Sequence, residues 1–272
     1  MVDSSLTVAA LQMEAQDDVP TNLEVVRRGV EAARARGARV ILLPENFAFM
    51  GPEEGKRELA ERLGDGGPIQ RALASAAREV GIAILAGGFP ERSEAPDRPY
   101  NACVAFDAQG VLRAVYRKIH LFDVDLVDGT SYRESRATSA GSEPVVVELE
   151  GFKFGLSVCY DLRFPELYRR LVDRGAEVLV VPAAFTLQTG KDHWHVLLRA
   201  RAIEAQCWVL AAAQWGRHPR GRATYGHSLL ADPWGHVVAE ASDRPGLVVG
   251  TVDREYLAAV RARVPSLAHR RL

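Results

Sequence analysis

The chain has 272 residues, 47% of them apolar and 25% charged, and these proportions are typical of a globular protein. Its formal net charge of −1 gives no electrostatic reason to expect a nucleic-acid or membrane partner. No apolar run is long enough to cross a bilayer, and the N-terminus lacks the features of a signal peptide. The length fits one large α/β domain, so we expect a single domain over residues 1–272.

The cysteines predict a reducing environment. Cys103, Cys159 and Cys207 are odd in number and scattered, and no Cys-x-x-Cys pair is present. This pattern does not fit a disulfide framework. We therefore expect a cytoplasmic protein.

The first half of the chain alternates strand and helix patterns. Residues 6–13 are apolar and predict a buried opening strand. Thr21-Asn-Leu-Glu24 has the form of a capping box, and apolar residues at helical spacing follow it as far as Gly37. The same criteria predict a helix over 68–81 and strands over 39–43, 82–89, 100–106 and 111–117. Two parallel strands therefore open the sheet, and an antiparallel hairpin follows.

Residues 118–143 show no sustained periodicity, yet they contain several aromatic and apolar side chains. A loop of this length within a compact domain is usually functional or disordered, and its composition does not fit disorder. We therefore expect this segment to contribute to a functional site.

The second half repeats the alternation of strands and helices. Its predicted elements are strands over 145–149, 152–158, 178–182, 207–213 and 247–252, helices over 165–174, 191–206 and 253–264, a basic loop over 215–224 and a hairpin around Pro233-Trp-Gly235. Each half thus runs strand, helix, strand, helix, strand and then hairpins, without a repeat in the sequence. We predict an α/β fold, a four-layer α-β-β-α sandwich of two mixed sheets with outer helices.

Cys159 lies where the predicted strand over 152–158 turns into a helix that begins at Pro165. Such a turn pushes a nucleophile out of the sheet and places backbone N–H groups near it. For this stretch taken alone, the alternative is a buried, inert cysteine that acts as a small hydrophobe.

Three more ionisable residues, Glu45, Lys118 and Glu134, end predicted strands or lie in the loops that follow them. Ligands of open α/β sheets bind at the carboxyl ends of strands. Taken singly, these residues fit a surface acid, a solvated lysine and a loop ion-pair partner. Together with Cys159 they fit nucleophilic catalysis, because a carboxylate can accept the thiol proton. A lysine between two carboxylates keeps its charge when buried and can stabilise an oxyanion.

The histidines predict no metal site. His193 and His195 are two residues apart, so on a helix they point to different sides. The other histidines have no ligand spacing, namely His120, His218, His227, His236 and His269. The chain also has no P-loop and no G-x-G-x-x-G motif.

Four motifs make the chain resemble the nitrilase superfamily of carbon–nitrogen hydrolases, over nearly its whole length. They are Leu42-Leu-Pro-Glu45-Asn46, Tyr116-Arg-Lys118-Ile-His-Leu-Phe122, Ser157-Val-Cys159-Tyr-Asp-Leu-Arg163-Phe-Pro-Glu166 and Tyr225-Gly-His-Ser-Leu-Leu-Ala-Asp-Pro-Trp-Gly235. Four such motifs in order and at family spacing are very specific. The resemblance implies an α-β-β-α sandwich, which in this family usually forms homodimers or larger homo-oligomers.

The resemblance also implies a set of catalytic roles. It makes Cys159 the nucleophile and Glu45 the general base, with Lys118 and the backbone N–H of Tyr160 holding the oxyanion. It implies a second glutamate in the loop after the lysine that supports the triad, and Tyr-Arg-Glu134-Ser matches it. The implied substrate is a small amide that carries a carboxylate, and no metal or organic cofactor is implied.

Within the superfamily, the chain is similar to the Nit branch, which contains ω-amidases and deaminated-glutathione amidases. The run over 184–218 is closer to the latter, which implies hydrolysis of deaminated glutathione to α-ketoglutarate and cysteinylglycine. The alternatives are an ω-amidase acting on α-ketoglutaramate or α-ketosuccinamate, a nitrile or N-carbamoyl hydrolase, and a scaffold without activity. A scaffold would need none of the four polar residues above.

Several residues are expected to bind substrate. Arg163 matches a family residue that lies near the substrate carboxylate, and Phe185 and Thr186 open the run closest to the deaminated-glutathione amidases. Deaminated glutathione has a second, distant carboxylate, for which a basic loop offers Arg217, Arg220 and Arg222. The alternative for this loop is a solvated basic segment without a ligand.

Overall fold

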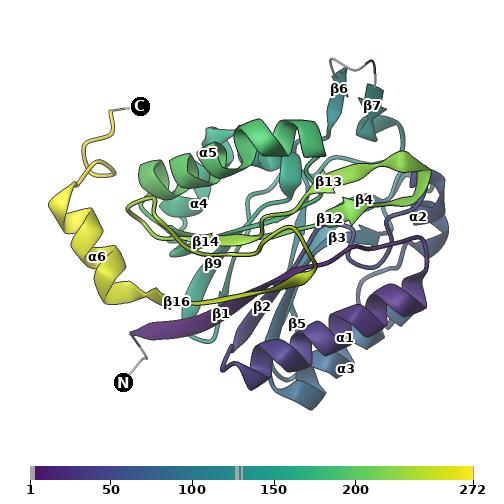
Figure 1. Ribbon diagram of the computed structural model, residues 1–272, viewed down its shortest axis with the longest axis horizontal. Helices are drawn as coiled ribbons and strands as arrows, with labels where there is room; N and C mark the ends of the chain where they lie inside the picture. Colours follow the sequence, from purple (N-terminus) through teal and green to yellow (C-terminus); the bar gives the residue numbers. More distant parts are fainter. Residues whose placement is uncertain (1–3, 126–128, 130, 272) are drawn as a thin grey trace.

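A computed structural model describes residues 4–125, 129 and 131–271 (Figure 1). The ends of the predicted domain, residues 1–3 and 272, and part of the predicted loop over 118–143 therefore lie outside the described residues.

Two six-stranded mixed sheets form the centre of the molecule. The first sheet has the order β16 (Gly246–Asp253), β1 (Ser5–Gln12), β2 (Val40–Leu43), β3 (Ala83–Glu91), β4 (Tyr100–Phe106) and β5 (Leu112–Arg117). The second has the order β15 (Val237–Glu240), β14 (Leu229–Ala231), β11 (Trp208–Ala213), β10 (Val178–Ala183), β9 (Phe152–Leu156) and β8 (Val146–Leu149).

The two sheets share one topology. Each has three parallel strands at its centre, β1-β2-β3 in one and β9-β10-β11 in the other. Each carries two antiparallel strands on one side and one on the other. The duplication predicted in outline is therefore present in the strand order. The last strand, β16, comes from the second half of the chain but lies in the first sheet, where it pairs with β1.

Helices cover the outer faces of the sheets. In Figure 1, α1 (Val19–Ala35) and α3 (Pro68–Val80) lie along one face, and α4 (Pro165–Asp173) and α5 (Leu187–Ala205) lie along the opposite face. The side chains of β2 alternate between the layers, since Val40 and Leu42 join the core that includes the second sheet, whereas Ile41 and Leu43 join the core under α1 and α3. Strands covered on both sides must be apolar on both faces. The predicted α-β-β-α sandwich is confirmed.

Several predicted boundaries were wrong for local reasons. Asp18, not Thr21, caps α1, and its carboxylate accepts from the Thr21 N–H at 2.8 Å. Helix α5 begins at Leu187 rather than at residue 191, because Thr186 caps it. The prediction also missed α2 (Glu53–Leu59), which lies between β2 and α3 in the chain.

The two long loops contain short elements. The predicted loop over 118–143 holds β6 (Asp123–Asp125), β7 (Ser131–Arg133) and the 3₁₀ turn η1 (Glu134–Arg136). The predicted basic loop is the hairpin of β12 (Trp215–Arg217) and β13 (Ala223–Tyr225), with the 3₁₀ turn η3 (Pro219–Gly221) at its tip. The chain closes with α6 (Arg254–Arg263). Within the described residues, no helix combines the length and the apolar character needed to span a membrane.

Candidate active site

Cys159 opens a tight turn at the end of β9. Its backbone has φ 51°, a left-handed conformation that few non-glycine residues adopt. The 3₁₀ turn η2 (Cys159–Arg163) follows at once, and α4 begins at Pro165. The predicted change from strand to helix at this cysteine is therefore present. Such strained residues persist only where their surroundings hold them, and they concentrate at functional sites.

A buried carboxylate holds this turn. Asp161 is fully buried and accepts the backbone N–H of Val158 at 2.8 Å, directly before the cysteine. It also accepts the Tyr116 hydroxyl at 2.7 Å and the backbone N–H of His120 at 3.0 Å. The His120 ring lies 2.7 Å from the same carboxylate and stacks on Phe164, with 3.7 Å between the centroids. The turn is thus tied to the segment that carries Lys118.

The fold brings Lys118 between two glutamates. Its ammonium lies 3.0 Å from Glu45 Oε1 and 2.8 Å from Glu134 Oε2. Glu45 follows β2, Lys118 follows β5 and Glu134 begins η1, so three separate segments converge. All three side chains are buried or nearly so. Cys159 completes the group, since it lines the same cavity and the charge of Glu45 acts on its thiol.

Neighbouring amides fix the two carboxylates. Asn101 Nδ2 bridges them, at 2.9 Å from Glu45 Oε1 and 3.0 Å from Glu134 Oε1. The backbone N–H of Ala184 donates to Glu45 Oε2 at 3.0 Å, and that of Phe122 donates to Glu134 Oε2 at 2.7 Å. Each carboxylate therefore has several donors that favour its ionised form.

The surroundings of Glu45, Lys118 and Cys159 shift the pKa of each side chain and so determine its charge. Burial alone would raise the pKa of Glu45, but the Lys118 ammonium and the hydrogen bonds from Cys159 and Asn101 lower it to about 2. Burial would likewise lower the pKa of Lys118, and the two glutamates raise it well above its usual value. Burial and the Glu45 charge raise the pKa of Cys159 well above its usual value. The group at rest is an ionised base beside a neutral thiol.

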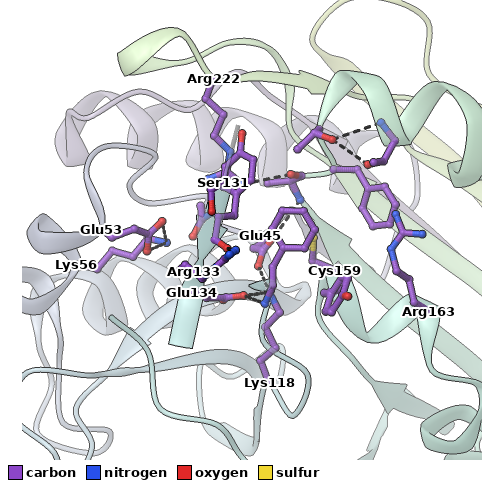
Figure 2. Close-up of a pocket in the computed structure, with 18 residues that line it drawn as sticks. Glu45, Glu53, Lys56, Lys118, Ser131, Arg133, Glu134, Cys159, Arg163 and Arg222 are labelled. Carbon is purple, nitrogen blue, oxygen red and sulfur yellow. Dashed lines mark hydrogen bonds and ion pairs between the residues drawn. The ribbon is translucent and has the colours of Figure 1, made fainter. Parts of the chain in front are cut away.

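These residues line a cavity of about 210 Å³ (Figure 2). Aromatic side chains form part of its wall. Among them, Tyr160 packs edge-on against Phe122, with 5.1 Å between the centroids. Phe185 and Thr186, which join β10 to α5, also line it. Nine of the sequence-predicted site residues lie around this cavity, namely Glu45, Lys118, Glu134, Cys159, Tyr160, Arg163, Phe185, Thr186 and Arg222.

Two cations of the cavity form no ion pair within the described residues, although the charge of Arg222 is near enough to lower the pKa of Glu45 and of Glu53. The Arg163 guanidinium lies 5.3 Å from the centroid of Phe185 and touches His193, at 3.3 Å. Arg222 lies 5.8 Å from the centroid of Tyr132, and its Nε is buried without a hydrogen-bond partner among the described residues. The other cations are paired, Lys118 with Glu45 and Glu134, Lys56 with Glu53, and Arg133 with Asp125. Figure 2 shows Arg163 and Arg222 on opposite sides of Cys159.

The three arginines of the basic loop differ in their position relative to the cavity. Arg222 enters the wall, whereas Arg217 and Arg220 are exposed and are not among the lining residues. Arg217 ends β12, and Arg220 lies at the hairpin tip. Of the three arginines predicted to bind substrate from this loop, one therefore reaches the cavity.

Sequence reasoning missed two residues that organise the site. Asn101 bridges the glutamates, and the only signal for it was a polar residue within the apolar strand pattern over 100–106. Asp161 holds the cysteine turn, and it lies within the motif quoted around Cys159. Neither role follows from spacing, because the partners are brought together by the fold.

Comparison with known proteins identifies the class. The carbon-nitrogen hydrolase family model matches residues 7–262. A protein of Synechocystis named deaminated glutathione amidase is 45% identical over 266 residues, which cover 96% of this chain and 97% of that protein. The chain belongs to the carbon–nitrogen hydrolase family, and it is an enzyme that hydrolyses carbon–nitrogen bonds other than peptide bonds.

Solved structures place it within the family. The Caenorhabditis elegans NitFhit structure superimposes with a TM-score of 0.92 at 37% identity and covers 100% of this chain, which in turn spans 66% of NitFhit. Saccharomyces cerevisiae Nit3, described as a member of branch 10 of the nitrilase superfamily, gives a TM-score of 0.87 at 28% identity, with coverage of 97% and 96%. The predicted resemblance to the Nit branch is confirmed.

Proposed function

We propose that this enzyme is a deaminated glutathione amidase that cleaves its substrate to α-ketoglutarate and cysteinylglycine. The observation that carries the proposal is the charge pattern of the cavity. A buried thiol, base and ammonium line it, and the two lining cations that form no ion pair among the described residues, Arg163 and Arg222, lie on opposite sides. Deaminated glutathione has a carboxylate at each end and its scissile amide between them.

In the proposed first half-reaction, Glu45 accepts the Cys159 proton while the sulfur attacks the amide carbonyl carbon. The proton moves during the attack because the resting thiol is neutral and its neighbour is an ionised carboxylate. The Lys118 ammonium and the Tyr160 backbone N–H stabilise the oxyanion. Collapse of this intermediate breaks the carbon–nitrogen bond, and Glu45 donates its proton to the leaving amine of cysteinylglycine.

The second half-reaction hydrolyses the α-ketoglutaryl thioester on Cys159. Water attacks the thioester carbonyl and gives a proton to Glu45, and the same donors hold the second oxyanion. The carbon–sulfur bond then breaks, and the sulfur takes the proton back. Lys118 keeps its charge throughout, because Glu134 remains beside it when Glu45 is protonated. The proposed cycle needs no metal or organic cofactor.

The two arginines are proposed to select a substrate with two carboxylates. Arginine pairs with carboxylates through two parallel hydrogen bonds, which fixes direction as well as charge. The α-keto acid end would bind one guanidinium and the glycine end the other, so that the amide lies over Cys159. The related amide α-ketoglutaramate has only the first carboxylate and would leave one arginine unused.

The test is a comparison of kcat/KM for deaminated glutathione and α-ketoglutaramate. The products cysteinylglycine, α-ketoglutarate and ammonia are followed by mass spectrometry and ammonia detection. We expect deaminated glutathione to be preferred, with glutathione itself as the control substrate. Equal or faster turnover of α-ketoglutaramate would make the enzyme an ω-amidase. Hydrolysis of simple nitriles or N-carbamoyl amino acids alone would assign it to another branch of the same chemistry.

We further propose that the enzyme forms a homodimer in the cytoplasm. Three buried, unpaired cysteines suit a reducing compartment. Exposed apolar side chains support self-association, because Ile203 of α5, Trp234 beside β14 and Val264 after α6 line one surface hollow. Light scattering with Ile203→Arg tests this surface. We expect that variant to be monomeric, and the equally exposed Val111→Arg to keep the wild-type mass.

A further inference from the structure

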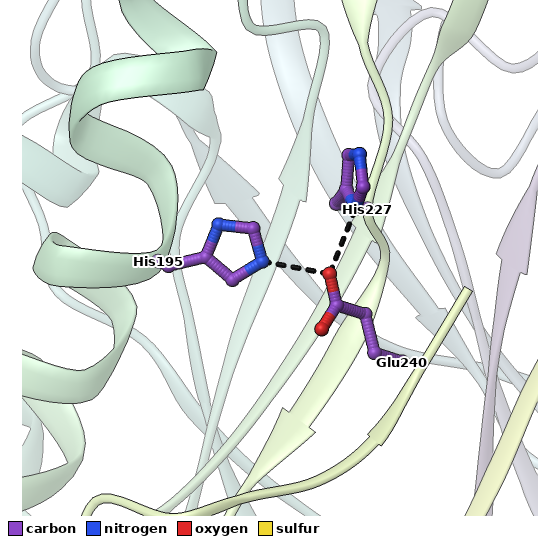
Figure 3. A group of neighbouring side chains, drawn as sticks. All are labelled: His195, His227 and Glu240. Atoms are coloured by element: carbon purple, nitrogen blue, oxygen red, sulfur yellow. Dashed lines mark hydrogen bonds and ion pairs between the residues drawn. The ribbon is translucent and has the colours of Figure 1, made fainter. Parts of the chain in front are cut away.

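A second cluster of metal-ligating side chains lies outside the cavity (Figure 3). It joins His195 of α5, His227 in the turn after β13 and Glu240 at the end of β15. One potential ligand atom from each lies within 4.8 Å of the others. No sequence pattern indicates this group, because Glu240 is 45 residues from His195 and 13 from His227. The fold brings them together.

The hydrogen bonds of the cluster leave one position for a cation. Glu240 Oε1 lies 2.7 Å from His195 Nε2 and 2.7 Å from His227 Nδ1. The other ring nitrogen of His227, Nε2, lies 3.2 Å from Asp243 Oδ1. A carboxylate only accepts, and a neutral imidazole has one N–H. Two carboxylate contacts on one ring thus suit a His227 side chain that carries either a second proton or a metal ion in its place.

The second coordination sphere is also present. Metal-binding histidines usually donate their other N–H to a carboxylate, which fixes the tautomer and directs the free lone pair at the metal. Asp243 stands in this position behind His227. Tyr225 stacks on the same ring, with centroids 4.4 Å apart at 27°. These contacts orient His227 Nδ1 toward His195 and Glu240.

Buried groups hold the backbone around the cluster. Trp194, next to His195, donates its indole N–H to the His227 carbonyl at 2.8 Å. Fully buried Gln12 accepts the Ser228 N–H at 2.8 Å and donates to the carbonyls of Ser242 and Arg244, at 2.7 and 2.8 Å. The residues that follow His227 and flank Asp243 are thus fixed by one side chain. The backbone that carries His227 and Asp243 is therefore preorganised.

We propose that His195, His227 and Glu240 bind one divalent zinc ion, or a similar borderline metal, with water as a fourth ligand. Two imidazoles and a carboxylate suit zinc, whose bonds to them are about 2.0–2.1 Å. The ion would clamp α5 to β15. Because Thr186 and Thr189 at the start of α5 line the catalytic cavity, the clamp secures one wall of that cavity without touching Cys159.

The test measures zinc uptake by chelator-treated, full-length Cys159→Ala, a background that removes the reactive thiol as a competing ligand. We expect one zinc per chain by equilibrium dialysis, and a thermal midpoint that rises with zinc. His195→Gln and Glu240→Gln should each weaken the affinity at least about tenfold. The matched control is His193→Gln, because His193 is exposed on the same helix and lies outside the cluster. It should bind zinc like its parent.

Cobalt gives an independent signature, since visible absorption bands of bound Co²⁺ report nitrogen and oxygen ligands rather than sulfur. We expect these bands in the parent and in His193→Gln, and their loss in Glu240→Gln. The proposal is overturned if the parent takes up no zinc, or if His195→Gln and Glu240→Gln bind as well as the control. His227→Asn, which tolerates the left-handed backbone at this position, φ 58°, supplies a third variant should one of the others misfold.

Discussion

The Lys118 ammonium lies 3.0 Å from the Glu45 carboxylate, and the two side chains are only 2% and 4% exposed. A buried ion pair of this kind costs desolvation energy that only good geometry and further hydrogen bonds offset. Here Glu134 and Asn101 supply those bonds. The ion pair therefore keeps the Glu45 base ionised and the Lys118 ammonium charged beside the Cys159 thiol.

The first prediction concerns the nucleophile, Cys159. We expect Cys159→Ala to abolish turnover, whereas Cys103→Ala and Cys207→Ala keep it, because both of those cysteines are buried in the core away from the cavity. Intact mass spectrometry during slow turnover should detect one acyl adduct, carried by Cys159. An adduct on either of the other cysteines, or activity without Cys159, contradicts the mechanism.

The second prediction concerns Lys118→Met. Loss of one oxyanion donor costs roughly a hundredfold in kcat or more. The variant also leaves two carboxylates facing each other without their cation, so one of them should bind a proton near neutral pH. Single-turnover kinetics measure the first effect and infrared titration of the carboxyl groups the second. Near-normal activity would show that Lys118 takes no part in the reaction.

The pH dependence follows from the pKa of Glu45, which is lowered from 4.5 to about 2. The carboxylate is charged above this value, so kcat/KM of the wild type should show no acid limb from Glu45 at mildly acidic pH. Its contribution to stability is present above pH 4.5 and is lost as the pH falls toward 2. In Lys118→Met the pKa of the base rises, and an acid limb should appear. Identical profiles for both proteins would rule out this electrostatic role.

Asp161 gives a prediction about positioning. Asp161→Ala removes the acceptor of three described donors, so the buried Val158 N–H and the proton of the buried Tyr116 hydroxyl lose the carboxylate that accepts them. We expect the free energy of unfolding to fall by about 3 kcal/mol, with a lower kcat and a nearly unchanged KM. Urea unfolding and steady-state kinetics measure both, with exposed Asp192→Ala as the control. A change in KM alone would place Asp161 in substrate binding instead.

Substrate recognition is tested by paired arginine variants. Arg222→Gln should raise KM for deaminated glutathione by roughly 10- to 100-fold, the effect of one hydrogen bond to a charged group. Arg217→Gln and Arg220→Gln are matched controls from the same hairpin, and both side chains lie outside the cavity. They should leave KM unchanged. Equal effects from all three would mean that the loop acts through its general charge.

Local patterns in the sequence determined much of this architecture. Two-sided apolar runs such as residues 178–182 indicated strands covered on both faces, and the turn at Cys159 was visible from a strand pattern followed by Pro165. The motifs around Glu45, Lys118 and Cys159 identified the family. These signals are local, because periodicity, capping and turn chemistry depend on neighbouring residues.

Other features depended on tertiary structure alone. The placement of β16 in the first sheet, the bridge of Asn101 between two glutamates and the entry of Arg222 into the cavity join segments far apart in the chain. The same is true of His195, His227 and Glu240. No local propensity encodes such contacts, since they arise when packing of the two sheets and their helices brings distant side chains into one place.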